Sequence, residues 1–272
     1  MKALKVLARS RSLAFTRDYL GNEPASRSAP VSVQWWNGDG RAVHYRPATS
    51  DVSLVYDILF KPGRKSEYWL PDGLEPRVVF DIGGNIGIAA RYLANRFPGA
   101  QVHSFEPVAE NLELMRRNLE GTGALVHGYG LGGESGVFEF HTPAGAPDDL
   151  SGYSRFGAAD AASKAVRGEI RAVPDVLQTL GMAAVDIIKI DVEGAEREVI
   201  DAFPDQFLAR ATWVYGELHG AALDPGMPFE LLKRLATWFD IEVHKRLRKR
   251  AWFFDACNRS ASQRFRDFRR GR

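Results

Sequence analysis

From residue 77 onward, short apolar runs alternate with longer segments in which apolar residues recur every three or four positions. Runs such as RVVFDIG and QVHSFEP are typical of buried strands, whereas the longer segments have the period of an amphipathic helix. Strands that alternate with helices indicate βαβ units, in which successive strands lie parallel. The pattern therefore predicts a doubly wound α/β fold whose sheet is covered by helices on both faces.

The individual elements follow from the same pattern. We expect strands at 77–83, 101–107, 124–130, 185–194, 212–220, 241–246 and 251–258, and helices at 87–97, 108–121, 173–181, 195–203 and 228–239. A hairpin-like segment at 136–142 leads into a polar segment rich in Gly and Ala at 143–168. Ligands of such folds bind beyond the carboxyl ends of the strands, so the residues that end the strands are the first candidates for a functional site.

The first 64 residues follow a different pattern. Residues 21–50 are rich in Gly, Pro and Ser, and the segment 31–47 predicts a β-hairpin that turns at NGDG, residues 37–40. Residues 51–70 have a helical period that Pro62 and Gly63 interrupt. We therefore divide the chain into an N-terminal extension of hairpin and helix at 1–64, a main domain at 65–257 and a basic C-terminal tail at 258–272.

Composition places the chain among ordinary globular proteins. Of its 272 residues, 45% are hydrophobic and 26% are charged, so we expect one large domain with an appendage. No apolar run approaches the roughly 20 residues that cross a bilayer, and the basic residues scattered through the start do not match a secretory signal. The single cysteine, Cys257, excludes an intrachain disulfide and a multi-cysteine zinc site. These features favour a cytoplasmic protein.

The net charge of +2 conceals an uneven distribution. Residues 245–272 hold eleven Lys and Arg against two Asp, and residues 1–20 hold five against one, so these ends carry +9 and +4. The body between them therefore carries about −11. A basic end can bind nucleic acid, a partner's acidic surface or, as a peripheral contact, an anionic membrane, but a merely solvated segment has the same composition. Charge alone does not define the chemistry or the oligomeric state.

Four of the predicted strands carry an acidic residue near their carboxyl ends: Asp81, Glu106, Asp191 and Glu217. A buried carboxylate costs free energy unless it is paired or hydrogen-bonded, so packing does not explain this coincidence. Because the carboxyl ends of parallel strands meet at one edge of a sheet, we expect a polar site at that edge.

The first of these strands leads into a glycine-rich turn, DIGGNIG, at residues 81–87. Gly83, Gly84 and Gly87 would let the main chain approach a ligand closely, and the following helix offers unpaired N–H groups. Asn85 replaces the second glycine of the dinucleotide fingerprint G-x-G-x-x-G. Asp81 would repel a pyrophosphate but suits the positively charged end of S-adenosylmethionine (SAM). A tight turn without any ligand is the alternative interpretation.

Glu106 stands 19 residues after Gly87, at the end of the next strand. Doubly wound folds place at this position the acid that accepts the hydroxyls of an adenosine ribose. The two oxygens of a carboxylate suit a vicinal diol. Pro107, which follows, is expected to open the next helix.

The segment IIKIDVEGAE, residues 187–196, adds further ionisable groups. Lys189, Asp191 and Glu193 alternate, so in an extended segment their side chains point to one side. They could fix the sulfonium end of SAM, deprotonate a hydroxyl or hold a divalent cation; a structural cluster of lysine and carboxylates is the alternative. Glu217 and His219 end the next strand, and His219 is a candidate proton acceptor near neutral pH.

Four segments in this order, VVFDIGGNIG, HSFEP, DIIKIDVEGAE and YGELH, resemble the FkbM family of SAM-dependent methyltransferases. The likeness covers roughly residues 65–220. It implies a class I methyltransferase fold, which is a Rossmann-like sheet of seven strands, mostly parallel, with the last strand antiparallel. It also implies O-methylation, typically of a hydroxyl on a sugar, glycan, glycolipid or natural product.

By position, the resemblance also implies roles for single residues. Asp191 and Glu193 would lie beside the transferred methyl group. From the residue pattern itself we add Lys189 and His219 to the catalytic site. The upstream segment SEY at 66–68 is similar to one that closes over the cofactor in this family. The cofactor-binding set is then Asp81, Gly83, Gly84, Asn85, Gly87, Glu106, Pro107, Glu67 and Tyr68.

Methyl transfer to a hydroxyl requires alignment and benefits from a general base. We rank the candidate bases in the order Asp191, Glu193, His219. A divalent metal bound by Asp191 and Glu193 is ranked below a metal-free route, because hydrogen bonding alone explains these residues. No metal ligand is therefore assigned.

Three other classes remain as alternatives. Short-chain NAD-dependent oxidoreductases that act on nucleotide sugars need Tyr-x-x-x-Lys, and no tyrosine here has Lys four positions on. A nucleic-acid methyltransferase would suit the basic tail, but residues 191–194, DVEG, replace the Asn/Asp-Pro-Pro-aromatic sequence of enzymes that methylate base amines. The third is a protein of this fold that binds a partner without catalysis. We expect a small-molecule or glycan acceptor rather than nucleic acid; the sequence does not specify which acceptor.

Overall fold

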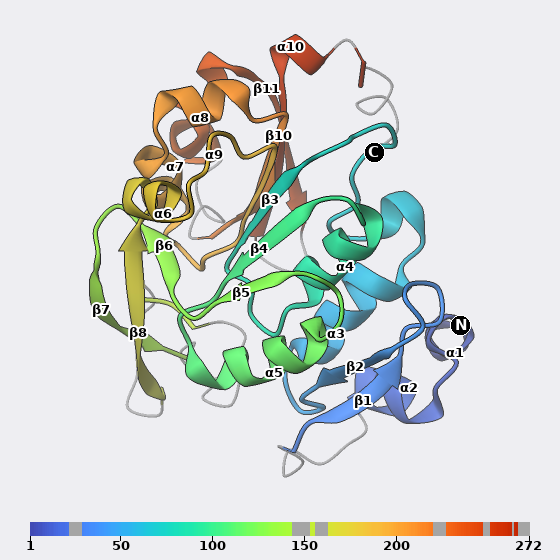
Figure 1. Ribbon diagram of the computed structural model, residues 1–272. Helices are drawn as coiled ribbons and strands as arrows, with labels where there is room; N and C mark the ends of the chain where they lie inside the picture. Colours follow the sequence, from blue (N-terminus) through green and yellow to red (C-terminus); the bar gives the residue numbers. More distant parts are fainter. Residues whose placement is uncertain are drawn as a thin grey trace.

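A seven-stranded sheet forms the centre of the molecule (Figure 1). The computed structural model describes residues 1–21, 29–142, 153–155, 163–219, 227–246, 251–262 and 264–265. The strand order is β11-β12-β10-β9-β3-β4-β5. These strands are β3 (Val78–Ile82), β4 (Gln101–Phe105), β5 (Leu125–His127), β9 (Ile187–Ile190), β10 (Trp213–Leu218), β11 (Phe239–Arg246) and β12 (Ala251–Asn258).

The sheet is parallel except at β12, which runs antiparallel to both of its neighbours, β10 and β11. Because β12 is the last strand of this sheet in the sequence, the predicted α/β fold and the direction of its last strand are confirmed. The strand order reverses at β3, whose neighbours are β4 on one side and β9 on the other. Doubly wound folds bind ligands beside such a reversal.

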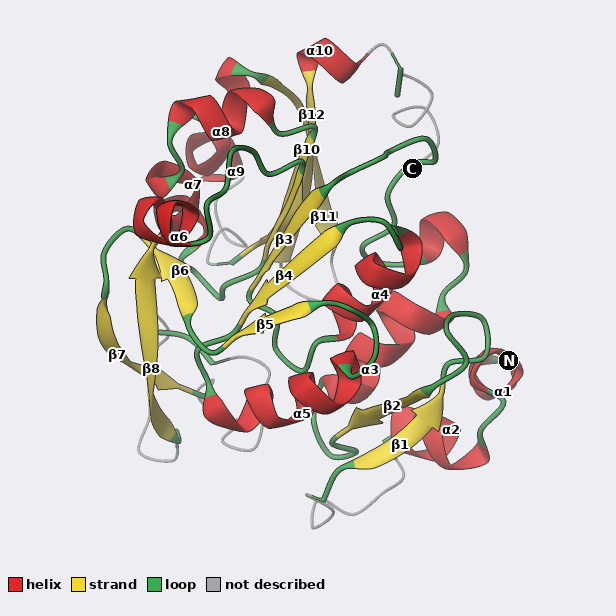
Figure 2. Cartoon of the chain, in the orientation of Figure 1, coloured by secondary structure: helices red, strands yellow, loops and turns green. Residues whose placement is uncertain are grey.

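Helices cover both faces of the sheet (Figures 1 and 2). One face carries α4 (Ile88–Arg96) and α5 (Ala109–Leu119). The other carries α6 (Val173–Thr179), α7 (Glu196–Ala202), α8 (Asp205–Arg210) and α9 (Met227–Leu232). Successive residues of β3 alternate between the two cores, since Val79 packs in the first and Phe80 in the second. Burial on both faces explains the nearly continuous apolar runs in the sequence.

The N-terminal extension packs on the face that carries α4 and α5. It consists of α1 (Lys2–Ser10), α2 (Leu13–Tyr19), a hairpin of β1 (Val31–Gln34) and β2 (Ala42–Tyr45), and α3 (Asp51–Val55), which continues into a π-helical turn at Tyr56–Phe60 and a 3-10 turn at Gly63–Lys65. The hairpin is as predicted, and the helix is interrupted at Pro62 and Gly63 as expected. Residues 66–70 are not helical, because only a single 3-10 turn follows the interruption. The sequence pattern does not predict α1 and α2, because they are short and depend on tertiary contacts such as Phe15 with Tyr45 and Phe60.

Two buried polar side chains join the extension to the main domain. The Arg91 guanidinium, 2% exposed, forms an ion pair with Asp39 and donates a hydrogen bond to the carbonyl of Ala42. The Asn118 amide accepts from the His44 N–H at 2.7 Å and donates to the carbonyl of the same residue at 2.9 Å. The extension thus shares a core and hydrogen bonds with the domain, and the boundary at residue 64 stays a prediction.

A smaller sheet lies beside the first, in the order β6-β8-β7. Its strands are β6 (Gly130–Gly132), β7 (Gly136–His141) and β8 (Ala165–Ala172). The predicted hairpin-like segment forms β7, but residues 165–168, assigned to the polar segment, begin β8. The alternation of Val166, Gly168 and Ile170 with charged residues is a weak strand signal, and pairing with β6 and β7 makes it a strand. Most of the segment 143–168 lies outside the described residues.

The basic tail is described only in part. Cys257 is buried in β12, and α10 (Arg259–Ser262) follows directly. Residues 247–250 and 266–272 lie outside the described residues, so the expected roles of the tail are not tested. None of the helices in the described ranges is long and apolar enough to span a bilayer. The cytoplasmic location stays a prediction.

We expect Asn118→Ala to lower the free energy of unfolding by about 2–4 kcal/mol, because each buried backbone group left unpaired costs roughly 1–3 kcal/mol. Asn118 is fully buried, and its amide also donates to the carbonyl of Ile86, just before α4. Urea unfolding followed by circular dichroism measures the change. Asn95→Ala, at an exposed position of α4, is the control. Equal unfolding free energies for the two variants would contradict the anchoring role.

Candidate functional site

The carboxyl edge of the sheet is built on a row of polar side chains in neighbouring strands. Asp81 of β3 is the register partner of Ser104 in β4 and of Lys189 in β9. Its carboxylate accepts a hydrogen bond from Ser104 Oγ at 2.7 Å and lies 3.0 Å from Lys189 Nζ. Burial lowers the pKa of Lys189, but Asp81 and Asp191 raise it above its usual value, so the amine stays charged. Each of the two buried charges therefore depends on the other.

Lys189 also fixes the glycine-rich turn. Its Nζ donates to the Gly83 carbonyl at 2.7 Å, and the N–H groups of Gly83 and Gly84 donate to the Phe105 carbonyl. Gly83 has φ +80°, and a Cβ there would lie 1.8 Å from the carbonyl oxygen of Asp191. The space left by this glycine is thus filled by the Asp191 backbone, just after β9. Gly83 also lines the pocket described below, so its approach to a ligand stays a prediction.

Both oxygens of the Glu106 carboxylate accept hydrogen bonds from neighbouring groups. Oε2 accepts from the N–H of Asn85, which has φ +49°, at 2.9 Å. Oε1 accepts from the Val108 N–H at 2.9 Å and from the Asn111 amide at 3.3 Å. Burial raises the pKa of Glu106, although these donors act in the opposite direction. Since a carboxylate has about four lone-pair sites, it can still accept from a ligand.

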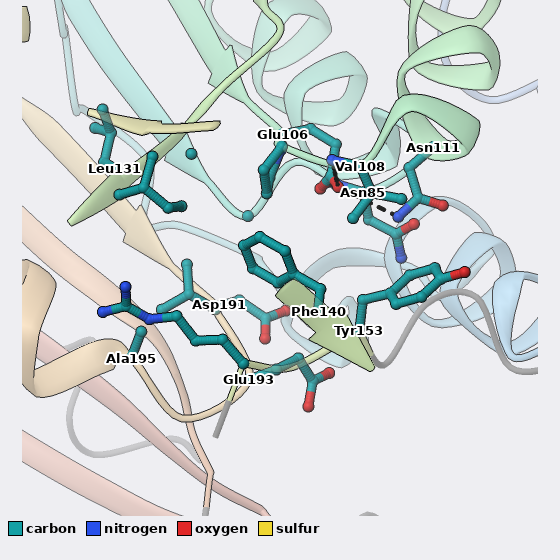
Figure 3. A pocket seen from close by; sticks show the side chains of 16 residues that line it. Asn85, Glu106, Val108, Asn111, Leu131, Phe140, Tyr153, Asp191, Glu193 and Ala195 are labelled. Carbon is teal, nitrogen blue, oxygen red and sulfur yellow. Dashed lines mark hydrogen bonds between the residues drawn. The ribbon is translucent and has the colours of Figure 1, made fainter. Parts of the chain in front are cut away.

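A pocket opens where the ends of β3, β4 and β9 meet the smaller sheet (Figure 3). Its volume is about 720 Å³, including the space at its mouth. The predicted site residues in its wall are Gly83, Asn85, Glu106, Pro107, Asp191 and Glu193. The rest of the wall consists of Val108, Asn111, Gly130, Leu131, Phe140, Tyr153, Arg155, Ile170, Val192 and Ala195.

Several predicted residues lie behind this wall. Asp81 is fully buried against Lys189, so it can act on a ligand only through the turn. Gly84 and Gly87 face Met115 of α5. These positions support the pocket and do not line it.

Pro107 differs from its predicted role. The helix α5 begins at Ala109, with Val108 as its N-cap, so Pro107 does not open the helix. It lines the pocket instead. Pro107 thus belongs to the pocket wall directly after Glu106.

Tyr68 reaches the site from the segment before β3. Its hydroxyl donates to Asp191 Oδ2 at 2.7 Å, and its ring centroid lies 5.3 Å from the Lys189 ammonium. Burial and the charges of Asp191 and neighbouring carboxylates raise the pKa of Tyr68 well above its usual value, so it remains a donor. Glu67 is also buried, its N–H donates to the Asp57 carbonyl, and it does not line the pocket.

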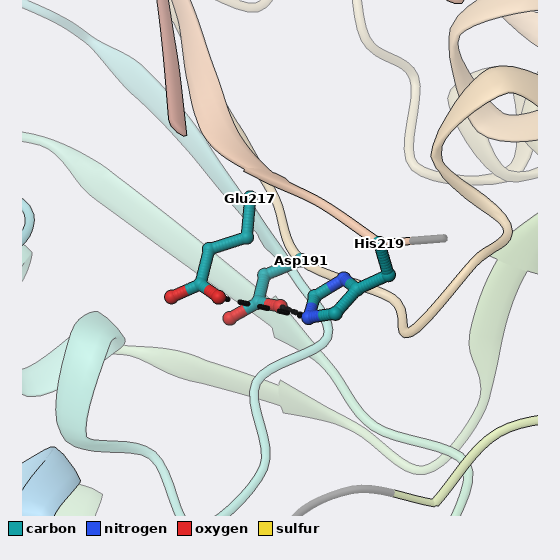
Figure 4. A group of neighbouring side chains, drawn as sticks. All are labelled: Asp191, Glu217 and His219. Atoms are coloured by element: carbon teal, nitrogen blue, oxygen red, sulfur yellow. Dashed lines mark ion pairs between the residues drawn. The ribbon is translucent and has the colours of Figure 1, made fainter. Parts of the chain in front are cut away.

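Four carboxylates surround the imidazole of His219, two of which are drawn in Figure 4. Nδ1 lies 2.8 Å from Glu196 Oε1, and Nε2 lies 3.4 Å from Glu193. Nε2 also lies 3.6 Å from Glu217 and 3.9 Å from Asp191. Burial lowers the pKa of His219, but the hydrogen bond to Glu196 and the charges of Glu193 and Asp191 raise it to about 10. The imidazole is therefore already protonated near neutral pH.

The same cluster offers ligand atoms for a divalent cation. Within the described residues, one atom each from Asp191, Glu217 and His219 lie within 4.8 Å of one another. The cation site considered from the sequence consisted of Asp191 and Glu193, so the structure groups Asp191 with different partners. A cation would require His219 to lose its Nε2 proton, so a bound metal and the ion pairs of the protonated imidazole exclude each other.

Two amide oxygens in the pocket wall test its fit to a nucleoside. Oδ1 of Asn85 and Oδ1 of Asn111 are buried and have no hydrogen-bond partner in the part of the chain that the structure describes. An unpaired buried acceptor costs roughly 1–3 kcal/mol. Both residues contact Glu106, so a ligand with hydroxyl or amine donors at this place would satisfy them. The set of acceptors fits a ribose.

Sequence reasoning missed part of the site. Asn111 follows Glu106 by five positions and could have been found as a neighbour on the first turn of α5. Glu196 lies inside the segment 187–196 but received no role. Phe140, Tyr153 and the other residues from the smaller sheet and its surroundings carry no local signal, because only the packing of the two sheets brings them to the pocket.

The strand order, the antiparallel last strand and the acidic edge define a class I methyltransferase fold. The methyltransferase FkbM domain family matches residues 81–249, more than half of the chain, and the chain belongs to this family.

Individual relatives are moderately similar. The chain is 28% identical over 207 residues to the AMB antimetabolite synthetase AmbE of Pseudomonas aeruginosa. This match covers 62% of this chain and 10% of the synthetase. The chain is 28% identical over 181 residues to the 31-O-demethyl-FK506 methyltransferase FkbM of Streptomyces tacrolimicus (56% and 70%). It is 27% identical over 183 residues to the 2-O-methyltransferase NoeI of Sinorhizobium fredii (60% and 72%). The chain thus spans a tenth of the synthetase and more than two thirds of the other two.

We expect His219 to make stability depend on pH above neutrality. A folded-state pKa of about 10, against roughly 6.5 in the unfolded chain, means that its contribution is complete below about pH 6.5 and is lost as the pH approaches 10. The free energy of unfolding should therefore fall between pH 7 and 9, by up to about 1.4 kcal/mol per pH unit. Urea unfolding of His219→Asn, measured alongside, should give a shallower slope. Identical slopes would show that the imidazole is not charged in the folded protein.

Proposed function

We propose that this protein is a SAM-dependent O-methyltransferase whose acceptor is a hydroxyl of a sugar, glycan, glycolipid or natural product. The observation that carries the proposal is one pocket lined by Glu106, suited to a ribose, and by Asp191 and Glu193, suited to a sulfonium and a hydroxyl. Family membership supports methyl transfer. The printed names of two relatives, a 31-O-demethyl-FK506 methyltransferase and a 2-O-methyltransferase, support oxygen as the acceptor atom.

The residues present fit SAM. Glu106, with the amide oxygens of Asn85 and Asn111, would accept hydrogen bonds from the ribose, and the turn at Gly83 would face the amino-acid end. When bound, SAM supplies an electrophilic methyl group. The protein then has to align the acceptor oxygen with that group and take up the hydroxyl proton.

Asp191 remains our first candidate for the general base, followed by Glu193. Asp191 Oδ2 accepts from Tyr68 and lies 3.8 Å from Lys189 Nζ, so one oxygen is fixed while the carboxylate lines the pocket. His219 is protonated in this arrangement and cannot take the first proton. Its charge instead allows three carboxylates to lie close together.

A divalent cation at Asp191, Glu217 and His219 is the alternative means of activating the hydroxyl. We favour the metal-free route because the protonated His219 already pairs with these carboxylates. Dialysis against EDTA separates the routes. Unchanged turnover supports the metal-free route, and a loss that added Mg²⁺ or Mn²⁺ restores would support the cation.

We expect Glu106→Gln to weaken SAM binding by about 10- to 100-fold, because hydrogen bonds to a charged acceptor contribute roughly 1.5–3 kcal/mol. Isothermal titration calorimetry measures the dissociation constant. Glu113→Gln, on the exposed side of α5, makes the same chemical change and should bind SAM normally. Equal affinities in the two variants would remove Glu106 from the ribose site.

Asp191→Asn should lower kcat by roughly 10²–10⁴-fold while SAM affinity changes little, because general-base catalysis contributes about that much. The amide still accepts a hydrogen bond from Tyr68, so the local geometry is largely retained. Stopped-time assays with labelled SAM give kcat, and calorimetry gives the affinity. Turnover at the wild-type level would place the base elsewhere.

The activity itself is tested with methyl-labelled SAM and a panel of methyl glycosides, glycolipids, polyketide alcohols and RNA. We expect label in an alkali-stable ether of one hydroxyl class and no transfer to RNA. Calorimetry should detect SAM and S-adenosylhomocysteine but not NAD. Binding of NAD in place of SAM, or methylation of RNA alone, would refute the proposal.

A further inference from the structure

Glu196 holds the imidazole of His219 from behind the acidic cluster. It is 1% exposed, and its Oε1 accepts from His219 Nδ1 at 2.8 Å and from the Gly194 N–H at 3.0 Å. A carboxylate oxygen only accepts here, so Nδ1 carries the hydrogen. The ring orientation is then fixed, and Nε2 faces the opposite direction.

Nε2 faces the part of the pocket lined by Asp191 and Glu193, where we place the methyl acceptor and which we call the acceptor end. Nε2 lies between 3.4 and 3.9 Å from carboxylate oxygens of Glu193, Glu217 and Asp191. Two of these, Glu193 and Asp191, line the pocket, whereas Glu196 and His219 do not. One imidazole therefore connects a buried carboxylate on α7 to the side chains at which we place the chemistry.

We propose that Glu196 is a positioning residue for methyl transfer, acting through His219 to set the carboxylates at the acceptor end of the pocket. The inference rests on the proposed function. Glu196 is the first residue of α7, whose Val199 and Ile200 are buried in the core beneath the sheet, so it projects from a rigid element. Held in this way, His219 separates Asp191, Glu193 and Glu217, which would otherwise repel one another.

A purely structural role of Glu196 predicts different effects of its substitution on stability, turnover and SAM affinity. If Glu196 served only to accept from Gly194 at the start of α7, its loss would lower stability and affect all ligands alike. A positioning role predicts a loss of turnover with SAM affinity retained. Both roles predict rescue by glutamine, whose amide oxygen can accept from Nδ1 and from the Gly194 N–H, so the split between turnover and SAM affinity separates them.

Crystal structures of Glu196→Ala and Glu196→Gln, each with S-adenosylhomocysteine, test the positioning without any acceptor. We expect Nε2 of His219 to stay within 4 Å of Glu193 and Glu217 in the glutamine variant, as in the native chain, and to leave them in the alanine variant. Glu230→Ala, at an exposed site of α9, is the control. An unmoved imidazole in Glu196→Ala would overturn the proposal.

Kinetics test the consequence, with the methyl glycosides of fucose, rhamnose and glucose as acceptor probes. We expect Glu196→Ala to lower kcat roughly 10- to 100-fold with the SAM dissociation constant within about 3-fold of the native value, and Glu196→Gln to retain most of the activity. Parallel losses of kcat and SAM affinity would leave only a structural role. No rescue by glutamine would show that the hydrogen bond from Nδ1 does not account for the loss. Either outcome would overturn the inference. If the native protein transfers no methyl group to any acceptor, the proposed function fails, while the crystal structures still decide the positioning.

Discussion

The buried ion pair between Asp81 and Lys189 is the contact on which the rest of the site depends. It joins the two strands at which the sheet reverses its order, and both side chains are almost fully removed from water. Breaking such a pair by removing one partner typically costs several kcal/mol, because it leaves an uncompensated buried charge. Lys189 extends the pair outward to the Gly83 carbonyl and to Asp191, so one ammonium fixes the glycine turn and orients a carboxylate of the pocket.

The glycine turn shows how packing and ligand binding share the same residues. Gly83 is required because the Asp191 carbonyl occupies the space of a side chain, and this close approach places Asp191 next to the turn. The turn in turn presents the Asn85 N–H to Glu106. The contacts that close the edge of the sheet thereby form the pocket, and a substitution there affects stability and binding together.

Charge balance explains the character of the acceptor end. Among the described residues, the carboxylates of Asp191 and Glu193 after β9, Glu217 of β10 and Glu196 of α7 outnumber the cations Lys189 and His219. Arg155, which also lines the pocket, is paired with Glu198. A site with an excess of negative charge attracts a sulfonium. It also disfavours an anionic cofactor, which agrees with the absence of the full dinucleotide fingerprint at Asn85.

The sequence by itself determined the alternation of strands and helices, the hairpin, and the acidic residues at the strand ends, because burial and turn chemistry leave a periodic record in the chain. Glu106, Asp191 and Glu193 could be found in this way, since Glu106 and Asp191 directly follow a strand and Glu193 stands two positions after Asp191. Tertiary structure alone decided that Asp81 and Lys189 pair inside the sheet, that Tyr68 reaches Asp191 across 123 positions of sequence, and that Glu196 supports His219. It also added the wall contributed by the smaller sheet. The physical reason is that ion pairs, hydrogen bonds and close contacts between distant segments depend on how the strands are ordered, and no local pattern records that order.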